Sequence, residues 1–184
     1  WGINEMSARA VTSVEELAAA DLDHRGGGVR RLIEAQDEAL RHEVANSSRI
    51  AESELTHFGG VTFNGTVTTW TATNQFTKAA VDISLPSATL GDKTQTLDTY
   101  VAGVGSITDG AVTVFQRMNE AGDMLRVATT VMTAEGKPAI GTFIPVTMAD
   151  GSANGVLAKV LKGETYTGTA YVVNALDQRI DRSH

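Results

Sequence analysis

The chain has 184 residues, with 15 Lys and Arg against 22 Asp and Glu, a formal net charge of −7 and no cysteine. This length suffices for one domain with a sizeable core and an added element. The acidic balance disfavours nucleic acid and anionic lipid as partners, since both attract basic surfaces, and the lack of cysteine excludes disulfides and thiolate catalysis.

The N-terminal part of the chain is predicted to be helical and interrupted once. Residues 12–16 (TSVEE) contain two overlapping capping boxes, which predict a helix start. The triplet Gly26–Gly28 predicts a break, because each glycine costs about 1 kcal/mol relative to alanine inside a helix. We therefore expect a helical segment over residues 1–58 with a break at 26–28.

The second predicted helix covers residues 29–58 and ends at Gly59–Gly60. Its stripe repeats every three or four residues and consists of Val29, Ile33, Gln36, Leu40, Val44, Ser47, Ala51, Leu55 and Phe58. Such a stripe can cover the core of the domain, or it can form the contact of a homodimer. Gln36 and Ser47 suit an interface at least as well as a dry core.

The rest of the chain is predicted to be a mainly antiparallel sheet with short helices. The expected elements are a hairpin over 61–70 turning at Asn64–Gly65, a strand over 81–85 that Pro86 stops, a helix near 97–104, strands over 111–118 and 124–133, and a helix over 156–161. Local turns between short strands, after one long helix that packs on the sheet, indicate an α+β fold.

Motifs for catalysis and for metal binding fail on inspection. The segment 150–155 (DGSANG) matches the first half of an EF-hand loop, but Leu161 stands where the loop requires a bidentate Glu. His24, His42 and His57 lack metal-ligand spacing, and no serine lies in a G-x-S-x-G turn. The sequence predicts no catalytic residue, no metal site and no cofactor, and we expect the chain not to be an enzyme.

Two arginines on neighbouring predicted strands are the candidate binding residues. Strict alternation places Phe115, Arg117, Arg126, Ala128 and Thr130 on one face of the strand pair. A guanidinium binds a carboxylate through two parallel charge-assisted hydrogen bonds, so this face suits a short organic acid. The alternative is an exposed face whose arginines pair with Asp or Glu.

The order of elements from residue 60 to residue 173 resembles that of single Cache domains, the PAS-like sensors of bacterial chemoreceptors and kinases. The resemblance covers about two-thirds of the chain and rests on VTFNG (61–65), AVTVFQR (111–117), LRVATTV (125–131), the turn region 136–141 and LKGETYTG (161–168). Carried over by position, it places Arg126, Thr129, Thr130 and Tyr166 in the matching strands. The polar segment 174–181 departs from the family pattern.

The resemblance implies a ligand-sensing domain outside the inner membrane, most often part of a methyl-accepting chemotaxis protein. We expect a sensor domain over residues 59–181 and a tag remnant over 182–184. The ligand is expected to be a small organic anion held by Arg126 with the help of Arg117. The other expected contacts are Phe115, Thr129, Thr130 and Tyr166, under covering loops 92–108 and 134–150.

The resemblance also implies that the parent protein is membrane-anchored. Gln36 and Ser47 within the apolar stripe predict that residues 29–58 form a homodimer with roughly parallel helices, as two membrane-anchored copies would require. Nucleic acid is not expected as a partner. The alternative function is a ligand-free dimerisation or protein-interaction module of a membrane signalling protein.

Overall fold

The computed structural model describes residues 2–166, with side chains from residue 27 onward. The elements are α1 (Gly2–His57), β1 (Val61–Asn74), β2 (Ala80–Leu90), α2 (Leu97–Thr108), β3 (Thr113–Arg117), β4 (Met124–Thr129), β5 (Thr142–Ile144) and α3 (Gly155–Val160). The strand predicted to begin near Tyr166, the polar segment 174–181 and the expected tag remnant lie beyond the described residues. The chain divides into two compact units, residues 1–44 and 45–184.

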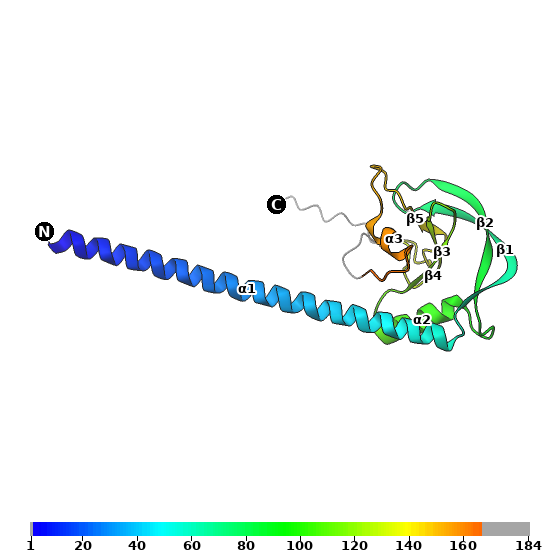
Figure 1. Cartoon of the computed structure of the whole chain (residues 1–184), viewed down its shortest axis with the longest axis horizontal. Coiled ribbons are helices and arrows are strands. Elements are labelled where there is room, and N and C mark those ends of the chain that lie inside the picture. Colours follow the sequence, from blue (N-terminus) through cyan, green and yellow to red (C-terminus); the bar gives the residue numbers. More distant parts are fainter. Residues whose placement is uncertain (1, 167–184) are drawn as a thin grey trace. The chain divides into compact units, whose positions relative to one another are not determined.

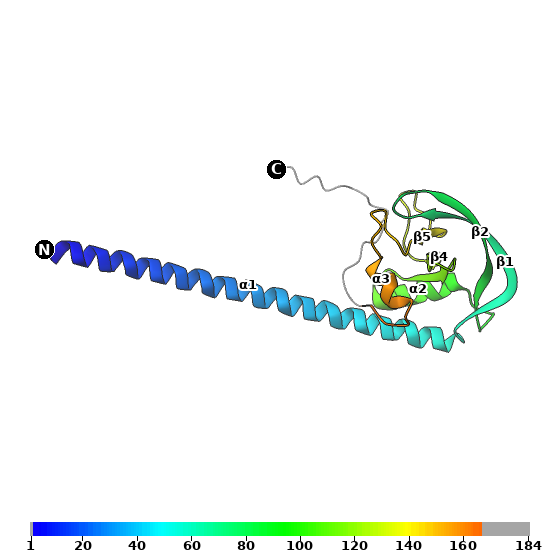
Figure 2. The same cartoon turned by 45° about the horizontal axis from the view of Figure 1, so that its top comes forward.

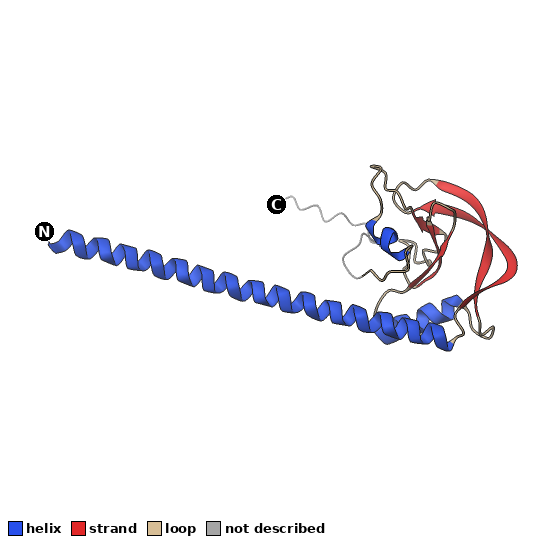
Figure 3. Cartoon of the chain, viewed as in Figure 1, coloured by secondary structure: helices blue, strands red, loops and turns tan. Residues whose placement is uncertain are grey.

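Helix α1 is continuous from Gly2 to His57, so the predicted break at 26–28 is wrong (Figure 3). Glycine weakens a helix but leaves its backbone hydrogen bonds in place. The following turn also carries local support: Arg31 Nε donates to the Gly27 carbonyl at 3.3 Å, and Arg30 pairs with Glu34 at 2.9 Å. The free-energy penalty of the glycines at 26–28 is therefore too small to end the helix.

The five strands form one mixed sheet in the order β2-β1-β5-β4-β3. Only β1 and β5 run parallel, through Thr73 and Thr142, and the other three strand pairs are antiparallel. The long β1–β2 hairpin is curved (Figures 1 and 2). A long N-terminal helix followed by this sheet confirms the predicted α+β, PAS-like fold.

Two strand predictions are wrong in their bounds. Asn64–Gly65 does not turn a hairpin but forms a bulge within β1, between Phe63 and Val67. Gly65 takes φ 78°, and the Asn64 side chain accepts a hydrogen bond from Thr66 N at 3.1 Å. Strand β2 continues through Pro86, which is possible because β2 lies at the sheet edge and needs no outward donor there.

One hydrophobic cluster lies between α2, β4 and the last turns of α1. Leu97, Tyr100, Val101 and Val104 of α2 contact Leu90 and Ala128, and Ala51, Leu55 and Phe58 complete the cluster. The Tyr100 hydroxyl donates to the Ala51 carbonyl at 2.8 Å. The end of the predicted stripe is therefore partly buried, whereas Val29, Ile33, Leu40 and Val44 are exposed.

A second hydrophobic cluster contains Ala72, Leu85, Met118, Leu125 and Phe143. Val127 packs against both clusters. In the β3–β4 ladder, Val114 opposes Ala128 while Phe115 opposes Arg126. Residues directly opposite each other share a face of the sheet, so Val114 and Ala128 face α2, and Phe115 and Arg126 face the other side.

Candidate functional site

Arg126 is the most buried charged side chain among the described residues. It is 1% exposed and lies near the middle of β4, between the buried Leu125 and the partly buried Val127. Its guanidinium carbon lies 5.4 Å from the centroid of the Phe115 ring, the residue opposite it on β3. The aromatic face offers the cation partial compensation.

The hydrogen bonds of Arg126 leave most of its donors unused. Nη1 donates to Thr142 Oγ1 at 2.7 Å and lies 3.5 Å from the Ala139 carbonyl, while Nε is buried and has no partner among the described residues. The ion pairs of the described residues all lie on the exposed surface of α1, and none involves Arg126. Burial lowers the pKa of the guanidinium, but arginine remains charged near neutral pH. Arg126 is therefore a buried cation without a counter-ion among these residues.

A cavity of about 360 Å³ adjoins the Arg126 side chain; we call it the Arg126 cavity. Its walls come from β3, β4, β5 and the start of α3, and from residues 148–154. The apolar lining is formed by Phe76, Phe115, Ile144, Met148, Val156 and Leu157. Among the described residues, Arg126 is the only charged one that lines this cavity, which therefore suits a small anion with an apolar part.

The segment over residues 146–157, which covers the cavity, is held by local hydrogen bonds. Asp123 Oδ1 accepts from the Val146 N–H at 2.8 Å, which ties the β3–β4 turn to the start of the segment. Asn154 caps α3 by accepting from the N–H groups of Val156 and Leu157. The polar turn at 150–155, which resembled half of an EF-hand loop, thus places the wall formed by α3.

Arg117 is not part of the cavity. It is exposed at the end of β3 and donates to the carbonyls of Asn119 and Glu120, which fixes the turn into β4. The sequence predicted Arg117 beside Arg126 on one face, but the turn carbonyls draw its side chain away.

Thr129 and Thr130 occupy opposite sides of the sheet. Thr129 Oγ1 lies 2.6 Å from Oγ1 of its cross-strand partner Thr113, which lines the cavity. The Thr130 side chain faces Gly105 of α2, and its hydroxyl accepts from Val112 N at 2.9 Å. The strand alternation that grouped Ala128 and Thr130 with Arg126 is broken, because β4 carries an extra residue at Val127 opposite the Val114–Phe115 step.

Tyr166, the last described residue, lies beside α3. The Lys159 ammonium lies 5.7 Å from the centroid of the Tyr166 ring. Tyr166 does not line the Arg126 cavity, so of the six predicted site residues only Phe115 and Arg126 do so. The apolar wall from Ile144 to Leu157 was missed, although the apolar residues in that segment offered a signal.

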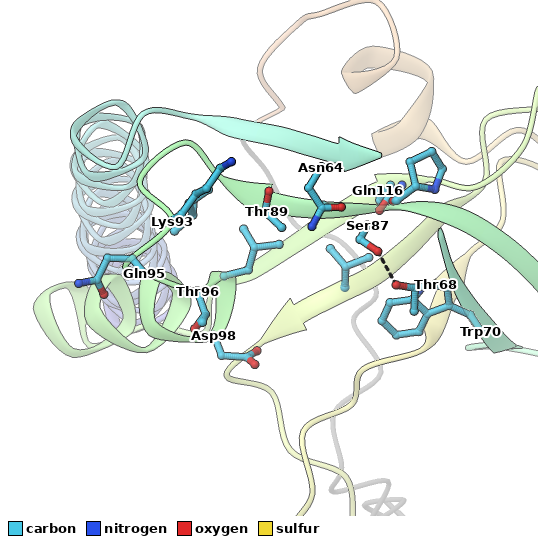
Figure 4. Close-up of a pocket in the computed structure, with 15 residues that line it drawn as sticks. Asn64, Thr68, Trp70, Ser87, Thr89, Lys93, Gln95, Thr96, Asp98 and Gln116 are labelled. Atoms are coloured by element: carbon cyan, nitrogen blue, oxygen red, sulfur yellow. Dashed lines mark hydrogen bonds between the residues drawn. The ribbon is translucent and has the colours of Figure 1, made fainter. Parts of the chain in front are cut away.

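A second and larger cavity, about 630 Å³, lies on the other face of the sheet (Figure 4). The β1–β2 hairpin and the first residues of α2 form its walls, together with Gln116 and Val127. Among the described residues that line it, one is aromatic, Trp70, and two are charged, Lys93 and Asp98. Sequence reasoning did not find this cavity, because its residues are spread from 64 to 127 and meet only in the fold.

Comparison with known proteins identifies the family. No curated protein and no solved structure matches the chain significantly. Among the described residues, no helix combines the length and the apolar character required to cross a membrane. The sequence model of the Cache 3/Cache 2 fusion domain matches residues 7–176. The chain therefore belongs to the Cache 3/Cache 2 fusion domain family, and so to the extracytoplasmic Cache domains, which act as sensors rather than catalysts.

Proposed function

We propose that this domain is the sensory module of a membrane-anchored chemoreceptor and that it binds a small organic anion, such as a short carboxylate, in the Arg126 cavity. The observation that carries the proposal is a buried arginine with no carboxylate partner among the described residues. An unpaired charge in a protein interior is costly, so its retention calls for a reason. A bound carboxylate supplies the missing counter-ion.

The remaining donors of Arg126 define how the anion would be held. Nη1 already bonds to Thr142, and this bond fixes the plane of the guanidinium. Nη2 has no partner among the described residues, and it is not one of the fully buried unpaired atoms. It is therefore the donor best placed for the ligand, and Phe115 and Leu157 offer apolar surface to the rest of it.

Signal passing would begin at the wall that the ligand touches. The expected covering loop 134–150 contributes Met148 to the cavity, and the carbonyl of Ala139 lies next to Arg126. The other expected loop, 92–108, is different: its residues 97–108 form α2 on the opposite face of the sheet. Only a difference in ligand affinity between two arrangements of the domain can drive the signal.

Calorimetry with short carboxylates tests the proposal. We expect acids such as acetate, propionate or succinate to bind, and Arg126→Ala to weaken binding about tenfold to hundredfold, the value of one charge-assisted pair. Arg117→Ala is the matched control, because it removes the same charge from an exposed position outside the cavity. Equal affinity of wild type and Arg126→Ala for a bound acid would move the site elsewhere.

We further propose that two copies associate in parallel through the exposed part of the α1 stripe. Val29, Ile33, Leu40 and Val44 are all exposed, and they repeat every three or four residues with Gln36 between them. Apolar residues at this spacing form the seam of a two-stranded coiled coil, and a polar residue within the seam sets its register. The partner that covers this stripe is the same stripe on a second copy of the chain.

Disulfide trapping tests this dimer, because the natural chain has no cysteine. In a parallel dimer Leu40→Cys places two thiols opposite each other, so we expect rapid disulfide formation on mild oxidation. Glu38→Cys on the far side of the helix is the control and should stay reduced. Equal rates for both variants would argue against the seam. A trapped dimer that binds no acid would instead favour the ligand-free dimerisation module.

A further inference from the structure

The segment that follows β5 leaves the sheet and returns to the point from which it started. At the start of this segment, the Val146 N–H donates to Asp123 Oδ1 at 2.8 Å. At its end, the Leu161 side chain covers Gly122, because a Cβ on that glycine would lie 2.6 Å from Leu161 Cδ1. Gly122 and Asp123 are neighbours in the turn between β3 and β4. Both ends of the segment are therefore attached to one turn.

The segment between these attachments, residues 146–160, is held together by its own hydrogen bonds; we call it the lid. Met148 N donates to the Ser152 carbonyl at 2.7 Å, and Asn154 N donates to the Val146 carbonyl at 2.8 Å. The Asn154 side chain then caps α3, which joins the helix to this small hairpin. A compact loop whose ends lie close together and whose interior is packed by its own residues forms a structural unit. The lid has this form.

The lid meets the sheet through apolar side chains. Met148, Val156 and Leu157 line the Arg126 cavity, and Leu157 is only 4% exposed. Among the described residues, no hydrogen bond or ion pair joins residues 146–160 to any strand. Separating the lid from the sheet therefore exposes apolar surface but leaves no buried polar group of the strands without its partner.

The lid is the wall of the cavity that can move. In the closed arrangement, solvent reaches only 1% of the Arg126 surface, although Arg126 lines the cavity. Access to the guanidinium therefore requires a wall to be displaced. The walls formed by β3, β4 and β5 are fixed by the hydrogen bonds of the sheet, whereas the lid has no such bonds to the strands.

We propose that the lid opens as one unit about the β3–β4 turn and so uncovers the Arg126 cavity. The latch that keeps it closed consists of the two attachments, at Gly122 and at Asp123. These two residues do not line the cavity, so they set how readily it opens and not what it binds. The passage of an organic anion through this opening rests on the proposed function, but the opening itself does not and can be measured without a ligand.

Thiol labelling measures the opening, because the natural chain has no cysteine. Leu157→Cys places a thiol on the inner side of the lid. Val101→Cys places one in the hydrophobic cluster beneath α2, where it reports global unfolding. We expect Leu157→Cys to react with a disulfide reagent such as DTNB about tenfold or more faster than Val101→Cys, because a local opening costs less free energy than global unfolding.

Variants of the latch test its role. Leu161→Ala removes one attachment and Asp123→Ala the other. Each should raise the labelling rate of Leu157→Cys about threefold, the equivalent of one net hydrogen bond or of a partly exposed apolar contact. Val160→Ala is the matched control, because Val160 is 41% exposed against 39% for Leu161 and its loss leaves the contact with Gly122 in place.

Hydrogen exchange in the chain without cysteine tests whether the lid moves as one unit. The Val146 N–H loses its acceptor on opening, whereas the N–H groups of Met148 and Asn154 keep acceptors within the lid, so we expect the Val146 amide to exchange faster. The proposal is overturned if these three amides exchange together, if Leu157→Cys reacts no faster than Val101→Cys, or if neither latch variant raises its rate. A lid that opens in a domain without affinity for acetate, propionate or succinate would contradict the proposed function and support the lid.

Discussion

Phe115 and Arg126 face each other across the β3–β4 ladder, with the guanidinium carbon 5.4 Å from the ring centroid. The aromatic ring and the Thr142 hydroxyl are the principal neutral groups that compensate this cation. Neither one neutralises its charge. The ligand-free domain therefore keeps an electrostatic penalty in its interior, and its stability should depend on what stands at position 126.

Replacing the cation by an apolar side chain of similar length should separate stability from binding. Arg126→Met removes the desolvated charge, so we expect the unfolding free energy without ligand to stay equal or rise by up to roughly 2 kcal/mol. Carboxylate binding should be lost in the same variant. Urea denaturation with and without acid measures both effects, and Arg117→Met is the exposed control. A large loss of stability would show that Arg126 serves mainly the fold.

Tyr100 should make the domain sensitive to alkaline pH. Burial, and secondarily Glu54, raises the pKa of the Tyr100 phenol above 10.0. The folded state therefore holds this proton to higher pH than the unfolded state, and the stability it confers is complete below pH 10.0 and lost as the pH rises further. Tyr100→Phe lacks this group, and it also loses the hydrogen bond to Ala51.

Denaturant titrations of wild type and Tyr100→Phe at two pH values test this. Near neutral pH the variant should be less stable by about 1 kcal/mol, the net value of one hydrogen bond. Above pH 10.0 the difference should shrink, because only the wild type loses the contribution of a neutral phenol. A constant difference at both pH values would contradict the raised pKa.

Gly91 should not tolerate alanine. A Cβ at this position would lie 2.5 Å from the carbonyl oxygen of Gly59, where the end of α1 meets the end of β2. The clash is with backbone, and Gly91 N also donates to the Gly60 carbonyl at 3.0 Å. We expect Gly91→Ala to lower the unfolding free energy by about 1–3 kcal/mol.

Gly103 is the matched control for that substitution. It lies within α2 with no atom in reach of an added Cβ. Gly103→Ala should therefore stabilise the domain by up to about 1 kcal/mol, through helix propensity alone. Thermal unfolding measures the change in stability for both variants. A change of the same sign in Gly91→Ala and Gly103→Ala would show that the contact at Gly59 is unimportant.

The continuity of α1 can be tested at its glycines. Gly27 and Gly28 are helical, and an added Cβ meets nothing closer than 3.9 Å. Replacing both by alanine should raise helix stability by about 1 kcal/mol per site. Circular dichroism during thermal melting would show it as a later loss of helical signal. A lower helical content in the double variant would indicate that the chain needs its glycines for a break.

The sequence was sufficient to pair Phe115 with Arg126, because alternation holds over the few residues around them. It failed for Ala128 and Thr130, because the extra residue at Val127 reverses the alternation and no residue type marks it. Asn64–Gly65 correctly indicated a residue with positive φ, but the chain uses this residue in a bulge within β1 and not in a hairpin turn. Whether an Asn-Gly pair forms a turn or a bulge depends on which strand the chain on either side of it pairs with, and here both sides pair with β2.

The opposite walls of the two cavities could not be predicted for a different reason. Met148 and Leu157 reach the Arg126 cavity, and Lys93 and Asp98 reach the larger cavity of Figure 4, through contacts between elements far apart in the chain. The curvature of the sheet that brings Pro86 of β2 to Gln116 of β3 is a property of the whole sheet. Local periodicity carries no information about such a closure.

The proline in β2 also affects how the protein behaves in concentrated solution. Within a strand, the nitrogen and carbonyl of one residue point to the same side, and the Pro86 carbonyl points toward Gln116 of β3. Its nitrogen therefore faces the same edge of β2 and offers no donor to an incoming strand. A second molecule cannot extend the sheet along an unbroken row of donors on β2, so Pro86 protects this edge against edge-to-edge aggregation.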